Sequence, residues 1–499
     1  MSKRLKNLLI AGSVLLVLVA AVVVLLLLPP AEEPKDNTDN DKDESVVLLE
    51  KDEKITVSSI DVTYDGEDFR LYADKDGQWL IDGYEDLPVD ATAVENVVEY
   101  MLKFEVDKQV VESTDSPADF GLEKPAATYT ATYSDDSTHM WYIGDKEPGG
   151  DGYYLQQQED EAIYLIGTYK GGLLLSDVRN YVDTILVTTP SINEDDENGA
   201  STIVKAELSG RVRDQAITLH SITTDTADEF PYFGYYISKP YRVGVSTASD
   251  LETTIGELRT VDALAAEVLH PTDKQIEKYG LDDPYSRLTI DLAIETYEED
   301  EDGNRTYSTY NPQSYDVRFS EKQKDGYYYA IRSDVDAIYQ VSADAVPWIA
   351  YEYDDIASDV LFMRDITTID TIVFELNGET YDVDLTHIED AAEGEANMTV
   401  QVNGKTADVM QLRRLYQVMM DIPRSGAAES VSGDAFFTIE LIDLDGKTVE
   451  RAKFYKRSAS TYACEQLNGE VYAVASSSVE NLIEQFERYL DGKVVTVTG

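Results

Sequence analysis

Residues 120–125 read Phe-Gly-Leu-Glu-Lys-Pro, and residues 279–284 read Tyr-Gly-Leu-Asp-Asp-Pro. The shared Gly-Leu-x-x-Pro element predicts a local structure, because glycine can take the positive φ that ends a short helix and proline holds the chain extended as it enters a strand. The leucine between them would fill the core. We interpret the element as a structural device rather than a binding loop, and its two copies predict a repeated unit.

The residues downstream of each element recur in the same order. A Gly-Tyr-Tyr strand at residues 152–154 precedes an Ile-Tyr strand at 163–164, and the same pair recurs at 326–328 and 338–339. The second copy is longer by about the size of an acidic insertion at residues 298–312, which we interpret as a loop. Without that insertion the two copies align.

Upstream of the first element, alternating apolar and polar residues predict strands at 60–64 and 69–72, separated by the turn residues Asp65 and Gly66. Asp90 can then cap a helix. That helix carries its apolar side chains at helical spacing, on Val94, Val97, Val98, Met101 and Leu102. The second copy shows a comparable helix near residues 248–258.

A third, divergent copy lacks the Gly-Leu-x-x-Pro element but keeps the order of strands and helices. Its predicted strands lie at 371–374, 381–384, 461–463 and 471–474, and its predicted helices lie near 409–420 and 477–490. Strand-rich units that each carry helices predict an α+β fold with mostly antiparallel strands. We expect three such modules, at residues 46–185, 200–360 and 365–495, the last divergent.

The N-terminus predicts a membrane anchor. Residues 8–28 are apolar except Gly12 and Ser13, and a helix of this length spans roughly 30 Å, the thickness of the hydrocarbon core of a bilayer. Residues 1–7 are basic, so this tail should be cytoplasmic and the C-terminal part extracytoplasmic. We expect an uncleaved transmembrane signal-anchor helix in the cell membrane; the alternative is a cleaved signal peptide. Residues 29–45 predict an acidic, disordered linker.

The charge of the chain bears on its partners. Its formal net charge of −56 argues against nucleic acid as a ligand, because that affinity comes mainly from Lys and Arg. The acidic surface could associate loosely with calcium or with basic proteins, and its simpler interpretation is solubility. The single cysteine, Cys464, excludes an intramolecular disulfide and predicts a small apolar residue on a strand.

A search for catalytic or metal-binding motifs predicts no catalytic residue, no cofactor and no metal site. The four histidines, at positions 139, 220, 270 and 387, are scattered singly, and no Gly-x-Ser-x-Gly or phosphate-binding loop is present. Asp39, Asp41, Asp43 and Glu50 follow the spacing of a calcium loop, but Glu44 stands where a glycine is needed. We therefore interpret that segment as acidic linker. Asp-Gly at 76–77 and at 445–446 predicts hairpin turns.

Tyrosine is abundant, with 34 residues and clusters at 232–236, 327–329 and 351–353. Tyrosines that alternate along a strand suit either the rim of a core or a face that binds protein or glycan. Both interpretations stay open at the level of sequence.

These features together carry a family resemblance. The basic N-terminus, the apolar helix, a Trp after Asp-Gly at 76–79, the Gly-Leu-x-x-Pro element, the Ile143-Gly144 strand and the Gly-Tyr-Tyr strands resemble the bacterial family known as domain of unknown function 4340. The resemblance implies an extracytoplasmic accessory component that accompanies transporters of the ATP-driven ABC class, including those named after gliding motility. It implies no catalytic residue.

The expected function is therefore a non-enzymatic, membrane-tethered accessory or interaction protein of an ABC-type transport complex at the bacterial cell envelope. The alternative is an extracellular module that binds a ligand or cell-wall glycan through its tyrosines.

Overall fold

The computed structural model describes residues 46–247, 251–300, 305–388, 397–426, 428 and 430–497. The predicted anchor at residues 8–28, the basic tail before it and the acidic linker up to residue 45 lie outside these residues. Within the described part of the chain, no helix is both long enough and apolar enough to cross a membrane.

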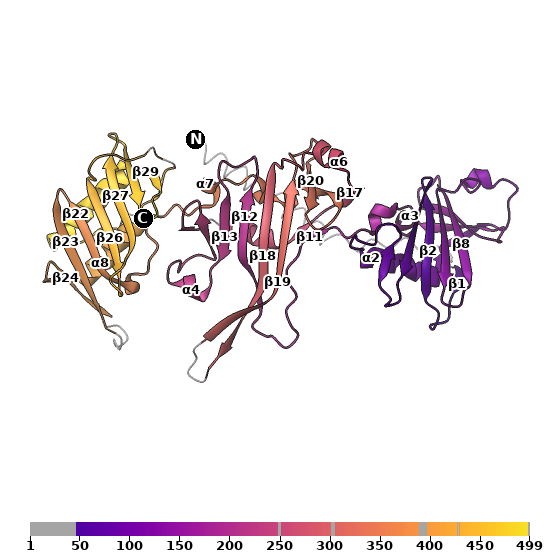
Figure 1. Ribbon diagram of the computed structural model, residues 1–499, viewed down its shortest axis with the longest axis horizontal. Helices are drawn as coiled ribbons and strands as arrows, with labels where there is room; N and C mark the ends of the chain where they lie inside the picture. The colour runs from indigo at the N-terminus through magenta and orange to yellow at the C-terminus, as the bar shows by residue number, and fades with distance from the viewer. Residues whose placement is uncertain are drawn as a thin grey trace, which may run out of the picture. The chain divides into compact units, whose positions relative to one another are not determined.

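The described fold is mostly antiparallel β-structure with some helices, arranged in several separate sheets (Figure 1). The chain divides into two compact units. The first unit holds the described residues up to Asp68 together with Asn96–Leu175, and the second holds Phe69–Glu95 and the chain from Ser176 onward.

In the first unit, strands β2-β7-β8-β9-β10-β6 lie side by side in this order, and β1 pairs with β5. The strands are β1 (Val46–Glu50), β2 (Val57–Tyr64), β5 (Lys103–Val106), β6 (Lys108–Val111), β7 (Ala127–Tyr133), β8 (Thr138–Lys146), β9 (Gly152–Gln157) and β10 (Ile163–Gly167). The helices of this unit are η1 (Pro117–Phe120) and α3 (Thr168–Leu174). Trp141 is fully buried and stacks on Phe104, with ring centroids 5.0 Å apart.

Helix α2 (Ala91–Leu102) forms where its capping residue and apolar face predict it. The side chain of Asp90 accepts the backbone N–H of Ala93 at 3.0 Å, which satisfies one of the free donors at the start of the helix. Val94, Val97 and Met101 are buried, so the predicted apolar face is the buried one.

The second unit contains β3 (Glu67–Ala73) and β4 (Trp79–Ile81), which pair antiparallel, and two larger sheets. We call them the middle and the last sheet. The middle sheet has the order β15-β14-β13-β12-β18-β19-β20-β21-β17, with β11 and β16 as a separate pair. These strands are β11 (Ile185–Val187), β12 (Ala200–Ser209), β13 (Ile217–Ser221), β14 (Tyr235–Lys239), β15 (Val243–Gly244), β16 (Val261–Asp262), β17 (Ala265–Leu269), β18 (Ser286–Glu299), β19 (Arg305–Phe319), β20 (Tyr327–Arg332) and β21 (Ala337–Ser342).

Short helices connect the strands of the middle sheet. They are η2 (Val178–Tyr181), α4 (Thr224–Ala227), α5 (Leu251–Gly256), η3 (Glu257–Arg259), α6 (Asp273–Lys278), η4 (Ala343–Ala345), η5 (Pro347–Ala350) and α7 (Tyr353–Ile356). The last sheet follows η6 (Ile366–Thr368) and has the order β25-β24-β23-β22-β26-β27-β28-β29.

The last sheet and its helices consist of β22 (Ile369–Leu376), β23 (Glu379–His387), β24 (Met398–Val402), β25 (Lys405–Ala407), α8 (Val409–Met420), β26 (Phe437–Asp443), β27 (Thr448–Lys456), β28 (Thr461–Gln466), β29 (Val471–Ala475) and α9 (Ser476–Leu490). The predicted strands correspond to β22, β23, β28 and β29, and the predicted helices to α8 and α9. Helices α8 and α9 pack together and against this sheet (Figure 1). Phe486 of α9 stacks on Phe374 of β22 at 4.1 Å between ring centroids, which places the core between helix and sheet.

Arg213 ties several segments of the middle sheet together. Its guanidinium is buried and donates only to neutral oxygens, of Ser209, Ser286, Trp348, Ile349 and Tyr351, at 2.6–3.1 Å. Burial lowers its pKa to about 10. The side chain thus holds the end of β12, the start of β18 and the segment around η5 in one place, because a buried guanidinium must have its donors satisfied.

The Gly-Leu-x-x-Pro element has the structure that its residues predict. Gly121 ends η1 with φ 71°, and Gly280 follows α6 with φ 72°. Leu281 is fully buried and Leu122 nearly so. In each copy a strand, β7 or β18, begins shortly after the proline.

The prediction that residues 298–312 form a loop is wrong. β18 runs to Glu299 and β19 starts at Arg305, so most of the insertion lengthens a hairpin that projects from the middle sheet (Figure 1). Cross-strand pairs continue along it: Tyr297 faces Tyr307, and Arg305 pairs with Glu299 at 2.9 Å. Such pairs stabilise a hairpin even where its residues are polar.

The two glycines provide a matched test of the element. The Gly280→Ala variant should lose about 1 kcal/mol of local stability, because alanine disfavours positive φ and the added Cβ meets no atom within 4 Å. The Gly121→Ala variant should lose more, because its Cβ would also lie 2.6 Å from the backbone nitrogen of Asp145. Hydrogen exchange of the amides in β7–β8 and β18–β19 measures both losses, and equal losses would contradict the close-approach argument.

Candidate functional site

The structure brings none of the four histidines together. His220 lies between the carbonyl of Val204 at 2.7 Å and the hydroxyl of Ser238 at 2.9 Å. His270 contacts Asp86 at 3.0 Å on the surface. Within the described residues, no group of three His, Cys, Asp or Glu side chains could hold a metal ion. His139 lies near the Trp141 ring, with centroids 5.9 Å apart, and His387 contacts the carbonyl of Ile369 at 2.7 Å.

The remaining predicted positions that fall within the described residues are structural. Asp39, Asp41 and Asp43 lie outside the described residues, and Glu50 is the last residue of β1. The side chains of Asp74 and Asp443 each accept two backbone N–H groups in hairpin turns, which confirms the turn interpretation. Cys464 is fully buried in β28, and burial raises the pKa of its thiol, so this thiol is poorly suited to nucleophilic chemistry.

The tyrosines of β20 contact one another and the protein core. Tyr328 points inward and is buried. The hydroxyls of Tyr327 and Tyr329 are 3.2 Å apart, and the Tyr329 ring packs edge-on against Tyr279 at 4.4 Å between centroids. Much of this cluster is therefore used for packing, and its aromatic faces are less available to a glycan than the sequence alone suggests.

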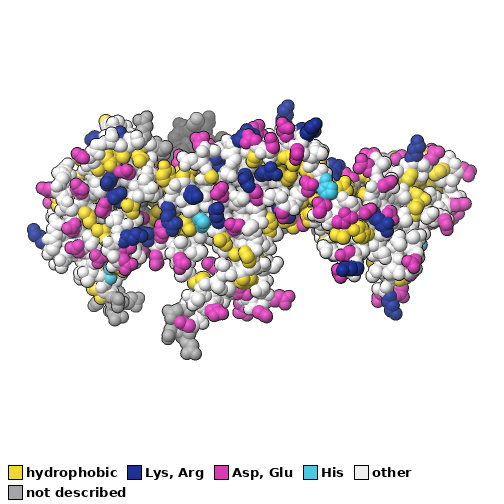
Figure 2. All heavy atoms as spheres, in the orientation of Figure 1, with side chains coloured by type: hydrophobic (Ala, Val, Ile, Leu, Met, Phe, Trp, Pro, Cys, Tyr) yellow, Lys and Arg dark blue, Asp and Glu magenta, His cyan; other side chains and the backbone are white. Residues whose placement is uncertain are grey.

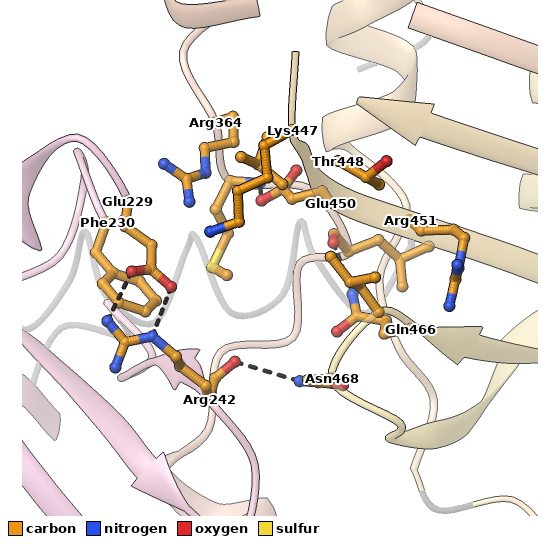
Figure 3. A pocket seen from close by; sticks show the side chains of 14 residues that line it. Glu229, Phe230, Arg242, Arg364, Lys447, Thr448, Glu450, Arg451, Gln466 and Asn468 are labelled. Carbon is orange, nitrogen blue, oxygen red and sulfur yellow. Dashed lines mark hydrogen bonds and ion pairs between the residues drawn. The ribbon is translucent and has the colours of Figure 1, made fainter. Parts of the chain in front are cut away.

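A cavity of about 330 Å³ in the second unit gathers charged side chains from three segments (Figure 3). We call it the cationic pocket and define it by the charged side chains that line it: Glu229, Arg242, Arg364, Lys447, Glu450 and Arg451. Phe230, Leu361 and Met363 supply apolar wall. Its volume is in the range of sites for small molecules.

Arg242 and Glu229 form one wall of the cationic pocket. Glu229 lies just after α4 and Arg242 just after β14, and the guanidinium donates to both carboxylate oxygens at 2.6 Å (Figure 3). The guanidinium also lies over the rings of Phe230 and Tyr236, at 5.3 and 4.7 Å from their centroids. These contacts raise the pKa of Arg242, chiefly through the hydrogen bonds with Glu229, and a bidentate pair of this kind fixes the side chain in one geometry.

Glu450 lies on β27 at the opposite wall. Its Oε1 accepts the backbone N–H of Met363 at 2.9 Å, whereas its Oε2 is buried and has no hydrogen-bond partner within the described residues. Burial raises the pKa of this carboxyl to about 7, although the Met363 N–H and the positive charge of Arg364 act in the opposite direction. Glu450 therefore changes its protonation near neutral pH.

Two cations of the pocket form no salt bridge within the described chain. They are Lys447 and Arg364; the latter donates to the carbonyl of Asp228 at 3.0 Å, and its positive charge acts on the carboxyl of Glu450. Figure 3 shows the Lys447 side chain reaching into the space between Glu450 and the Glu229–Arg242 pair. The pocket thus presents positive charge and N–H donors beside an apolar wall.

A second buried polar cluster lies elsewhere in the same unit. Arg424 and Glu470 form an ion pair at 2.7 Å, and both side chains are only 7% exposed. The guanidinium also lies over the rings of Tyr353 and Tyr472, at 5.3 and 5.6 Å from their centroids. Because the geometry is close and the aromatic faces contribute, we interpret this cluster as structural.

No pattern in the amino-acid sequence predicted the cationic pocket. Its residues lie between positions 229 and 468, and they meet only because β14, the segment before η6, and β27–β28 converge. One weak signal exists: Lys447-Thr448-Val449-Glu450-Arg451 carries two basic residues within a strongly acidic chain. Nothing in that pentapeptide indicates that the Oε2 atom of Glu450 is buried.

Replacing Glu450 by glutamine tests its protonation. Since its pKa in the folded protein is above the ordinary 4.5, its contribution to stability is full below pH 4.5 and is lost as the pH rises to about 7. Glutamine keeps the acceptor for Met363 without the charge. The free energy of unfolding of Glu450→Gln relative to wild type should therefore rise between these pH values, by on the order of 1–3 kcal/mol.

Calorimetric melting of the full chain across this pH range measures the difference. Glu484→Gln, which removes one exposed carboxylate from α9, is the matched control for loss of charge. A difference between Glu450→Gln and wild type that does not change with pH would show that Glu450 titrates as an ordinary surface carboxyl.

No curated protein and no solved structure matches the chain, but one family of proteins does. The family described as domain of unknown function (DUF4340) matches residues 79–200 and 237–424. Between these ranges the match leaves out β13, all of β12 except its first residue, and the first two residues of β14, and it ends after α8. These matched residues make up more than half of the chain, and the protein is a member of the DUF4340 family.

Proposed function

We propose that the chain is a non-enzymatic, membrane-tethered extracytoplasmic accessory protein of an ABC-type transport complex at the bacterial cell envelope. The observation that carries the proposal is the apolar stretch at residues 8–28, behind a basic tail and ahead of a long strand-rich region. The family resemblance implies the transporter partnership.

The described sheets suit an interaction role. The middle and the last sheet each consist of two antiparallel meanders whose first strands, β12 with β18 and β22 with β26, lie side by side. We propose that these sheets and the sheet of the first unit are copies of one module, the third divergent, at residues 46–185, 200–360 and 365–495. A string of such modules offers several faces to partners, as repeat proteins do.

The distribution of the acidic side chains supports our proposal that the modules are soluble and extracytoplasmic. They are spread over the whole face seen in Figure 2 rather than gathered into one patch. Dispersed charge of one sign keeps a domain soluble and repels anionic polymers. We therefore propose that a partner recognises the modules through contacts with a local surface, and not through attraction to the net charge of the protein.

Crosslinking in intact cells tests the partnership. Subunits of a membrane transport complex should be recovered with the full chain, and they should be depleted when an untagged chain competes for the same sites. An unrelated protein carrying the same residues 1–45 is the matched control for mere proximity in the membrane. Recovery of transport subunits with both proteins alike, or with neither, would contradict the proposal.

A chain that starts after Pro30 tests the tether. A tether raises the local concentration of the modules beside a membrane partner. The truncated chain should thus keep the circular dichroism and melting behaviour of the modules but recover transport subunits at least about tenfold less efficiently. Fusion of residues 31–499 to an unrelated single-pass helix should restore the recovery, and full recovery by the untethered chain would contradict the tethering role.

A further inference from the structure

We propose that the cationic pocket binds a small organic anion, a carboxylate or phosphate on a short carbon skeleton. This site is independent of the proposed partnership with a transporter, because it lies inside the second unit and needs no partner chain. The argument rests on the charge of the pocket, on the side chains left without partners, and on its apolar wall.

The charge of the pocket is opposite to that of the protein. The chain as a whole has a net charge of −56, whereas the pocket is lined by four basic and two acidic side chains. Surface lysines and arginines in so acidic a protein have many carboxylates available to them. A cavity that collects basic groups, two of which form no salt bridge within the described chain, therefore favours negative charge.

The hydrogen bonds show which groups are available to a ligand. Arg242 is occupied by Glu229 at 2.6 Å, and the amides of Gln466 and Asn468 donate to the carbonyls of Leu361 and Arg242. Arg364 uses one nitrogen on a carbonyl, and Lys447 has no carboxylate partner within the described residues. Lys447 and Arg364 are thus the groups that an anion would contact.

Other features of the pocket define the rest of the ligand. Phe230 and Leu361 are buried apolar residues that line the cavity beside Met363. A ligand can bury a few of its carbon atoms against them, away from water. The volume of about 330 Å³ suits a small molecule. The ion pair between Arg242 and Glu229 already holds both side chains in one conformation. Binding of a ligand beside them therefore costs little side-chain entropy.

Protonation of Glu450 should be coupled to binding. An ionised Glu450 repels an anion in the pocket, whereas the protonated carboxyl does not, so binding and proton uptake favour each other. The charged groups that face the pocket with Glu450 are Glu229 and Arg242 after α4 and β14, Arg364 before η6, and Lys447 and Arg451 beside Glu450 itself. Burial raises the pKa of Glu450 to about 7.

Isothermal titration of the full chain in mild detergent with glutarate, glutaramide and inorganic phosphate tests the proposal. Glutarate should bind one site with a dissociation constant of about 1 mM or lower, and its neutral isostere glutaramide should not bind. Binding of both glutarate and inorganic phosphate would show that the charged groups suffice, and binding of glutarate without binding of phosphate would show that the carbon skeleton is needed; both outcomes support the proposal.

Two lysine variants locate the site. Lys447→Met should weaken glutarate binding at least about tenfold, because one charge-assisted contact is lost. Lys456→Met is the matched control, since this lysine lies on β27 and is exposed outside the pocket. Both side chains are exposed, so both variants should fold, and circular dichroism checks that they do.

The pH dependence of binding provides a second readout. Glutarate should bind more tightly at pH 6 than at pH 8 in the wild type, and Glu450→Gln should remove most of that difference. Equal binding of glutarate and glutaramide, equal effects of the two lysine variants, or no saturable binding of glutarate up to about 50 mM would each overturn the proposal.

Discussion

The central strands of the middle and the last sheet are neighbours in space but far apart in sequence, and much of the fold follows from this constraint. β12 ends at Ser209 and its neighbour β18 begins at Ser286; β22 ends at Leu376 and β26 begins at Phe437. The chain between them must leave the centre of the sheet and return to it. The helices α5, α6 and α8, and in the middle sheet the Gly-Leu-x-x-Pro element, lie on this return path.

Closing so long a connection costs conformational entropy, and the contacts at its end offset that cost. In the middle sheet, buried Leu281 packs with Ile331 and Ile338, and Arg213 joins the last residues of β12 to the first of β18. In the last sheet, helices α8 and α9 have the same effect through Phe486 and Leu415. The positive φ of Gly280 turns the chain from α6 toward β18.

The cationic pocket exists because different parts of the second unit converge, and its properties are not those of any one segment. The Glu229–Arg242 pair comes from the first half of the middle sheet, whereas Glu450 and Lys447 come from the last sheet. A carboxyl with a pKa near neutral requires burial. The lining of the cavity buries the carboxylate of Glu450, and Arg364 and Lys447, which form no salt bridge within the described chain, set the sign of the charge that the cavity prefers.

Local rules were sufficient for much of the fold. The cap of Asp90, the bounds of α8, the glycine turns and the buried leucines depend on residues within a few positions of one another, so the sequence by itself determined them. Residues 298–312 were mistaken for a loop, because their polar composition hides the cross-strand pairing of Tyr297 with Tyr307. The pocket could not be predicted, because it forms where residues 229–242, 361–364 and 447–468 meet, and the burial of the Glu450 carboxylate depends on that meeting. Pairing and burial between distant segments are properties of the tertiary structure, and only that structure decided where this protein gathers its charge.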